Sequence, residues 1–220
     1  MNYIQSMGIL ALCILSAEYT AGGTGISNSE KAPAISTPSS TASVSARANS
    51  ARTAVALKVP ANFTSYASES IGRNLLCHVG AVTGDDGMEQ KPVVYAENEK
   101  DKKILWVKHL QLPPNTFQSR ATHCAGSGDA AFVLIQSDTQ SEQTLSQTLL
   151  RVVKLNADTG ALITQQDLNV PKAYTAWVAE GAGRFKWQGN AMVIAGNYRP
   201  SSDDADQPEL TVHLNGDLKP

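Results

Sequence analysis

The sequence predicts an all-β fold, built of antiparallel sheets in about three propeller-like repeat units. Short runs of β-branched or aromatic residues alternate with Gly, Asp, Asn and Pro, and the apolar spacing of helices is scarce. These runs also recur at a period of about 60 residues, which is typical of propeller blades or of a repeated sheet. Together the two observations favour a partial β-propeller, and a β-sandwich is the alternative.

Eight segments carry the strand pattern. Each is short, rich in β-branched or aromatic residues, and bounded by turn-forming residues. They comprise residues 74–82, 92–96, 103–110, 130–136, 148–155, 162–168, 191–197 and 210–214.

Two pairs of these segments resemble each other. Residues 128–135 resemble residues 189–194 at an offset of 61, and residues 149–156 resemble residues 209–215 at an offset of 59. We therefore expect residues 56–220 to form one all-β repeat domain. Its length gives between two and three units of about 60 residues, fewer than the four to eight blades of a closed propeller. An oligomer is expected if the propeller is completed between chains.

One hairpin has a recognisable motif. Residues 154–162, Lys-Leu-Asn-Ala-Asp-Thr-Gly-Ala-Leu, resemble the hairpin of quinoprotein-type β-propeller repeats, in which Ala-x-Thr-Gly makes a tight turn between two outer strands. Asp158 and Gly160 suit such a turn, because Asp caps its own backbone and Gly adopts positive φ. Thr164 stands where these repeats usually carry Trp. The resemblance implies a fold and gives no support for a quinone cofactor.

Residues 1–20 are predicted to be a signal peptide or a lipoprotein signal. The apolar run over residues 7–17 is shorter than the roughly 20 residues that cross a bilayer, and it matches the core of an export signal. Residues 10–13, Leu-Ala-Leu-Cys, resemble the lipobox of bacterial lipoproteins. Cys13 is then either the lipidated anchor or part of a signal peptide that is removed.

Residues 21–55 are predicted to be a disordered linker. Ala, Gly, Ser, Thr, Pro and Asn supply 27 of these 35 residues, so the segment lacks the apolar surface that would offset its ordering entropy. An apolar segment followed by a polar tether predicts an exported, periplasmic protein. A lipid on Cys13 would also anchor it to the membrane.

The two remaining cysteines, Cys77 and Cys124, are predicted to form a disulfide, because an exported domain meets an oxidising compartment. Their neighbours His78 and His123 suggest a metal site instead. Adjacent residues on a strand point to opposite faces, so a Cys-His pair directs its two groups apart. Two separate buried thiols are the other alternative. We expect no metal, no cofactor and no catalytic residues.

The charge balance and the aromatic residues bear on the partner. Lys and Arg number 18 against 20 Asp and Glu, which argues against nucleic-acid binding. Five of the thirteen aromatic residues lie within residues 174–198, and rigid rings of this kind often anchor protein interfaces. Trp177 and Tyr198 are the first candidates for partner-binding residues.

These observations favour noncatalytic protein binding. No carboxylates and histidines recur at matching repeat positions, as a repeat-built active site would require. The sequence therefore predicts a protein-binding domain of the bacterial cell envelope, such as a periplasmic scaffold, inhibitor or immunity-type protein. The alternative is a propeller-type secreted hydrolase or lyase.

Overall fold

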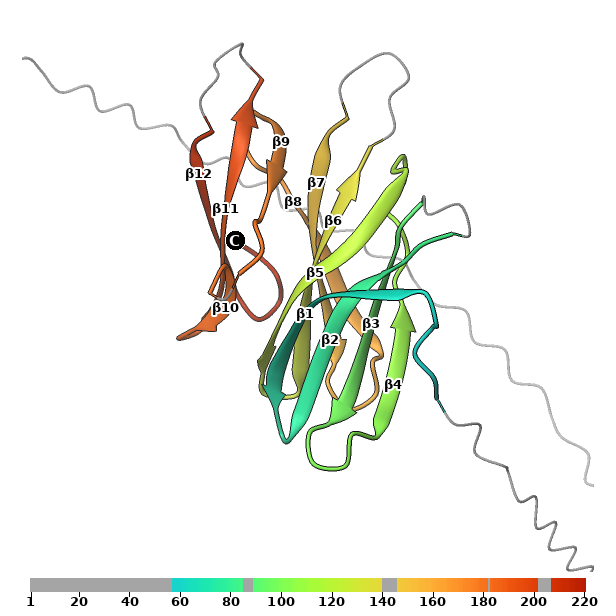
Figure 1. Ribbon diagram of the computed structural model, residues 1–220. Coiled ribbons are helices and arrows are strands. Elements are labelled where there is room, and N and C mark those ends of the chain that lie inside the picture. The colour runs from blue at the N-terminus through green and yellow to red at the C-terminus, as the bar shows by residue number, and fades with distance from the viewer. Residues whose placement is uncertain (1–56, 85–88, 140–145, 182, 202–206) are drawn as a thin grey trace, which may run out of the picture. The chain divides into compact units, whose positions relative to one another are not determined.

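The computed structural model describes residues 57–84, 89–139, 146–181, 183–201 and 207–220. They belong to one compact unit, Arg52–Pro220, and they form strands and turns without a helix among them (Figure 1). Accordingly, the described part of the chain contains no helix that could span a membrane. The predicted signal over residues 1–20, with Cys13, and the predicted linker over residues 21–55 lie outside the described residues. The all-β class is confirmed.

Three antiparallel sheets of four strands follow one another along the chain (Figure 1). Sheet A contains β1 (Phe63–Gly72), β2 (Leu75–Val82), β3 (Lys91–Asn98) and β4 (Ile104–His109), in this order. Sheet B contains β5 (Gln118–Ser127), β6 (Ala130–Asp138), β7 (Thr148–Asn156) and β8 (Leu162–Leu168), also in order. Sheet C contains β9 (Ala173–Trp177), β10 (Phe185–Gln188), β11 (Ala191–Pro200) and β12 (Glu209–Leu214). In sheet C, β9 and β10 pair with the same edge of β11 and together take the place of a single first strand.

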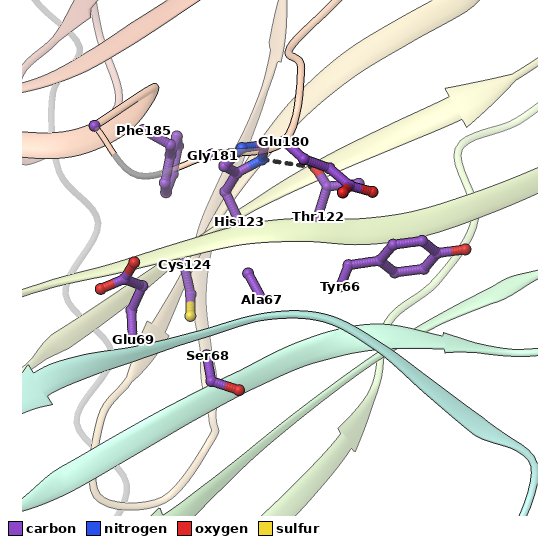
Figure 2. A pocket seen from close by; sticks show the side chains of 11 residues that line it. Tyr66, Ala67, Ser68, Glu69, Thr122, His123, Cys124, Glu180, Gly181 and Phe185 are labelled. Atoms are coloured by element: carbon purple, nitrogen blue, oxygen red, sulfur yellow. Dashed lines mark hydrogen bonds between the residues drawn. The ribbon is translucent and has the colours of Figure 1, made fainter.

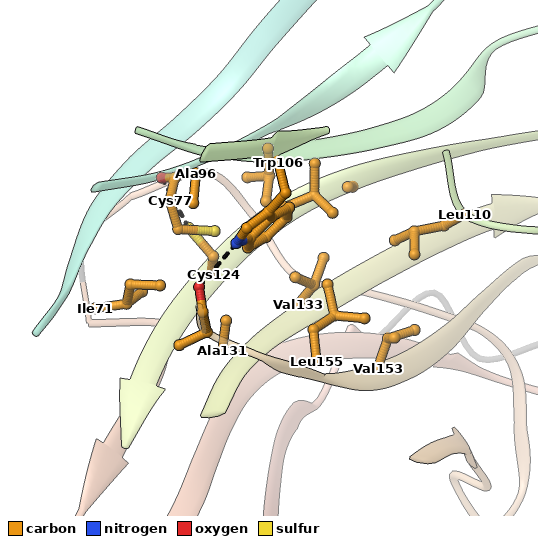
Figure 3. Close-up of a cluster of buried hydrophobic side chains, with 14 of the residues drawn as sticks. Ile71, Cys77, Ala96, Trp106, Leu110, Cys124, Ala131, Val133, Val153 and Leu155 are labelled. Atoms are coloured by element: carbon orange, nitrogen blue, oxygen red, sulfur yellow. Dashed lines mark hydrogen bonds between the residues drawn. The ribbon is translucent and has the colours of Figure 1, made fainter. Parts of the chain in front are cut away.

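Sheet B packs between the other two sheets. Alternate residues of a strand face opposite sides, and on β6 both sides are apolar and buried. Val133 and Ile135 join a core shared with sheet A, part of which is drawn in Figure 3. Phe132 and Leu134 join a second core shared with sheet C. The continuous apolar run of β6 is thus explained by burial on two faces.

A repeated turn follows the third strand of each sheet. Asn98, Asn156 and Asn215 each donate the backbone N–H across the turn at 2.8–2.9 Å, and each Oδ1 accepts the N–H two residues further on. Each turn also contains one residue with φ between 57° and 67°, namely Lys102, Gly160 and Leu218. The recurrence of this turn supports the repeat that the sequence predicts.

Sheets A and B each donate a side-chain hydrogen bond to this turn of the sheet that follows. The indole Nε1 of Trp106 in sheet A donates to the carbonyl of Ala157, at 2.8 Å. In sheet B, Lys154 Nζ donates to the carbonyl of Gly216, at 2.7 Å. Ala157 and Gly216 both directly follow a turn asparagine. We call the carbonyl at this position the turn carbonyl.

Candidate functional site

A pocket of about 240 Å³ lies where the first strands of the three sheets meet (Figure 2). Its walls are residues 66–69 of β1, residues 122–124 of β5, and Glu180, Gly181, Gly183 and Phe185 around the start of β10. Every sheet therefore contributes to one cavity. This shared position makes the pocket the main candidate site.

Close contact between β1 and β5 sets one boundary of this region. A side chain on Gly126 would place its Cβ 2.5 Å from the backbone of Ile71, so the two strands touch there only because residue 126 has no side chain. Further along β1, short and polar residues replace the apolar contacts of the core, and the strands leave room for the pocket.

His123, on the pocket wall, is bound through both ring nitrogens. Its Nε2 lies 3.1 Å from the carbonyl of Ala179, so this nitrogen carries the hydrogen and donates it. Its Nδ1 lies 3.0 Å from Thr122 Oγ1, whose hydroxyl can donate to it. Burial lowers the pKa of His123, against the opposing effects of the Ala179 carbonyl and the charge of Glu180. The ring is therefore neutral at pH 7 and holds the Ala179 backbone.

Gln136 binds the same segment of chain, at Val178, the residue before Ala179. Its Nε2 donates to the carbonyl of Val178 at 2.9 Å, and its Oε1 accepts the Val178 N–H at 3.0 Å. The same Nε2 lies 3.1 Å from Thr122 Oγ1. These buried polar groups satisfy one another, so they hold the segment that carries Glu180 in a defined position.

The pocket is acidic. Glu69 and Glu180 contribute two carboxyl groups, which lie on opposite sides of the pocket in Figure 2, and its described lining includes no Lys or Arg. Tyr66 and Phe185 contribute aromatic rings. Carboxylates together with ring faces suit a cationic group, which gains from Coulomb attraction and from contact with the rings.

A second polar cluster lies on the face of sheet A that points away from sheet B. Ser68 Oγ lies 2.7 Å from His78 Nδ1, and His78 Nε2 lies 3.4 Å from the nearer carboxylate oxygen of Glu97. The ring of Tyr95 stacks on His78 with centroids 4.4 Å apart. Ser68, His78 and Tyr95 are register partners on neighbouring strands, so this is a cross-strand row.

The two predicted disulfide partners are neighbours, but the structure contains them as free thiols. Cys124 Sγ donates to the carbonyl of Cys77 at 3.2 Å, and both residues are buried in the core between sheets A and B (Figure 3). Burial, together with the hydrogen bond and the charge of Cys124, raises the pKa of the Cys77 thiol. The bridge itself stays a prediction.

The cysteines and histidines do not combine into a metal site in the described structure. Cys77 points into the core, whereas His78 lies on the opposite face of β2, as expected for adjacent strand residues. Among the described residues, no three His, Cys, Asp or Glu side chains come close enough together to hold a metal ion.

The two candidate aromatic residues, Trp177 and Tyr198, do not share a surface. The register partner of Trp177 is Asn197, whereas that of Tyr198 is Ala176, so the two side chains point to opposite faces of sheet C. Tyr198 packs against the core between sheets B and C. The structure therefore does not unite them in one partner-binding patch.

Sequence reasoning missed the acidic residues of the pocket. Glu69 and Glu180 belong to no motif, and each is an ordinary exposed residue of its own segment. The sequence indicates His123 only as a metal ligand beside Cys124. The pocket becomes visible only when the first strands are brought together. No protein-family model matches this chain, and no curated protein matches it.

Proposed function

We propose that this chain is a noncatalytic protein-binding domain of the bacterial cell envelope, a periplasmic scaffold, inhibitor or immunity-type protein. Its three sheets are blades of a partial β-propeller. The envelope location rests on the export-type composition of residues 1–55. The binding function rests on the acidic pocket between the first strands.

Three features support the blade interpretation. Each sheet starts at a first strand beside the pocket and proceeds outward strand by strand, and each third strand ends in the same asparagine turn. In sheet A, Trp106 follows the positive-φ residue Lys102 by four residues, the spacing found in quinoprotein-type repeats. Its indole contacts the corresponding turn of sheet B.

The hydrogen bonding of His123 supports a binding function over a catalytic one. Both of its ring nitrogens are used to hold neighbouring groups, and the Cys124 thiol is bonded to a backbone carbonyl. Two groups that could act as base or nucleophile are thus engaged within the fold. Among the described lining residues, the charged groups are the carboxylates of Glu69 and Glu180, which bind a Lys or Arg side chain of the partner protein.

Comparative capture tests this function. The full chain, a double variant Glu69→Gln/Glu180→Gln and the control Asp217→Asn are immobilised and exposed to envelope extract. Asp217 is exposed and lies outside the pocket lining, and its substitution also removes a negative charge. We expect the same protein on the wild type and on Asp217→Asn, and at least about tenfold less on the double variant. Equal retention by all three proteins would contradict binding in the pocket.

The alternative, a secreted hydrolase or lyase, is favoured by one observation. Ser68, His78 and Glu97 stand in the order of a nucleophile, a base and an acid. The discriminating test uses a fluorophosphonate probe, which reacts with activated serines. Stoichiometric labelling of Ser68 that is lost in His78→Ala would favour the enzyme. An unlabelled chain supports the binding function.

A further inference from the structure

The face of sheet A that carries the row of Ser68, His78 and Glu97 also carries a group of apolar residues, and no other described sheet covers it. The register places Leu76, Val93, Tyr95, Ile104 and Val107 on the side opposite the core shared with sheet B. We call this surface the outer face of sheet A. Four of these five residues are only partly buried, although they lie in the middle strands and on β4. Large apolar residues grouped beside polar ones on an open sheet face are typical of a contact surface.

Sheet C also has a face that no other described sheet covers. Ala191, Val193 and Ala195 alternate along β11 on the side opposite the core shared with sheet B. Lys186 and His213 flank Val193 in register on the neighbouring strands, and both are exposed. We call this surface the outer face of sheet C. Its small central residues make it flat enough to accept larger side chains.

The hydrogen bonds to the turn carbonyls all run in one direction, from a preceding sheet to the next, and this order indicates how a further sheet would pack. Each preceding sheet donates a hydrogen bond to the turn carbonyl of the next, from Trp106 to Ala157 and from Lys154 to Gly216. The corresponding carbonyl of sheet A belongs to Glu99, which follows Asn98. No donor to it is recorded within the described part of the chain.

His213 is the matching donor at the other end of the series. It stands two residues before Asn215, as Lys154 stands two residues before Asn156. Lys154 points toward the next sheet, and His213 points to the outer face of sheet C, where the next sheet would lie. Within the described residues, the series of sheets therefore ends at the His213 ring, which has no acceptor, and begins at the Glu99 carbonyl, which has no donor.

We propose that a second copy of this chain packs head to tail against the first, with the outer face of its sheet C on the outer face of sheet A. His213 of one copy donates to the Glu99 carbonyl of the other. A second copy is favoured because it brings the flat face, the apolar face and the missing donor together in the order already used within the chain. Such a contact is heterologous, so it closes into a ring or continues as a filament.

Sedimentation analysis of the full chain over a range of concentrations provides the test. We expect association of the wild type, and at least about tenfold weaker association of Val107→Glu, on sheet A, and of Val193→Glu, on sheet C. Gln166→Glu, on exposed strand β8, is the control and should associate like the wild type. Circular dichroism and melting confirm that each variant folds. A wild type that remains monomeric at all concentrations would overturn the proposal.

Mixing the variants tests the head-to-tail arrangement itself. Val107→Glu keeps an intact sheet C face and Val193→Glu keeps an intact sheet A face, so a one-to-one mixture should form a dimer that neither variant forms alone. If two like faces met instead, no such complementation would occur, and that result would also overturn the proposal. His213→Lys should associate like the wild type and His213→Ala more weakly; equal association of both would refute the His213 contact.

Discussion

The contact between Trp106 and Gly160 allows the packing of sheet A on sheet B to be measured. Gly160 has φ 67°, and a Cβ at this position would lie 2.6 Å from the ring of Trp106. Gly160→Ala therefore imposes two costs at once, a left-handed backbone on a residue with a side chain and a collision with a buried indole. Gly128 has nearly the same φ, 59°, but a Cβ there would meet no atom within 4 Å. Gly128→Ala thus imposes the backbone cost alone.

The two costs have different sizes. Holding alanine in the left-handed region costs about 1–2 kcal/mol, which applies to both variants. Overpacking against the indole adds about 1–3 kcal/mol, which applies to Gly160→Ala only. We expect a loss of about 2–5 kcal/mol in the free energy of unfolding for Gly160→Ala and about 1–2 kcal/mol for Gly128→Ala. The larger loss is a substantial share of the roughly 5–15 kcal/mol by which domains are stable.

Urea unfolding of the full chain, followed by circular dichroism, measures these losses. A third protein carries Gly160→Ala together with Trp106→Leu, and is compared with Trp106→Leu alone. In this background the smaller side chain leaves room for the methyl group, so the cost of Gly160→Ala should fall to that of Gly128→Ala. Equal losses for Gly160→Ala and Gly128→Ala in the native background would refute the contact.

Three further predictions concern His123, Asp138 and the pair Cys77 and Cys124. Burial lowers the pKa of His123 in the folded protein, so the stability that the neutral ring contributes is present above its unfolded pKa of about 6.5 and is lost as the pH falls below that value. The melting temperature should therefore drop more steeply from pH 7 to pH 5 in the wild type than in His123→Gln. Parallel melting curves for the two proteins would contradict this. For Asp138, burial alone would raise the pKa, but hydrogen bonds led by that from Arg120 lower it below 3.8. Asp138→Asn should therefore cost about 1–3 kcal/mol at pH 7 in urea unfolding, and this difference should shrink as pH falls below 3.8. For Cys77 and Cys124, thiol counting under denaturing, nonreducing conditions should find no free thiol in envelope-purified protein, in which Cys13 is lipidated or removed. Two free thiols would refute the disulfide.

The outer strands of each sheet could be predicted from the sequence, whereas the first strands could not. All eight predicted segments coincide with strands, among them β6, whose first six residues are all apolar, and β8, whose bounds agree at both ends. By contrast, β1 and β5 consist largely of Ser, Thr, Ala, Gly and charged residues. They are strands because their neighbours supply hydrogen bonds on one side and close packing at Gly126, which are properties of the assembled sheets.

The candidate site depended on the strands that were missed. Glu69 lies within β1, which was not predicted, and Glu180 lies in the segment between β9 and β10, so no local sequence pattern connects the two residues. His123 and Cys124 attracted notice because of their chemistry, but their partners are the backbone of Ala179 and of Cys77, which are distant in sequence.

The turn within residues 154–162 was predicted, since a turn depends on neighbouring residues alone. Its side-chain acceptor is Asn156 and not Asp158, whose carboxylate binds Arg73. The recurrence of the turn at Asn98 and Asn215 was not predicted.

The position of sheet B between two layers has a consequence for synthesis. Within each sheet, neighbouring strands follow one another in sequence, so each sheet can form as soon as its own strands have emerged. The face of β6 that carries Phe132 and Leu134 must nevertheless wait for β11, roughly 60 residues later. At about 5–20 residues per second, this apolar face is exposed for several seconds during translation. A holding chaperone would therefore act on the intermediate that has two sheets, and carboxyl-terminal truncations before β11 should aggregate where the full chain stays soluble.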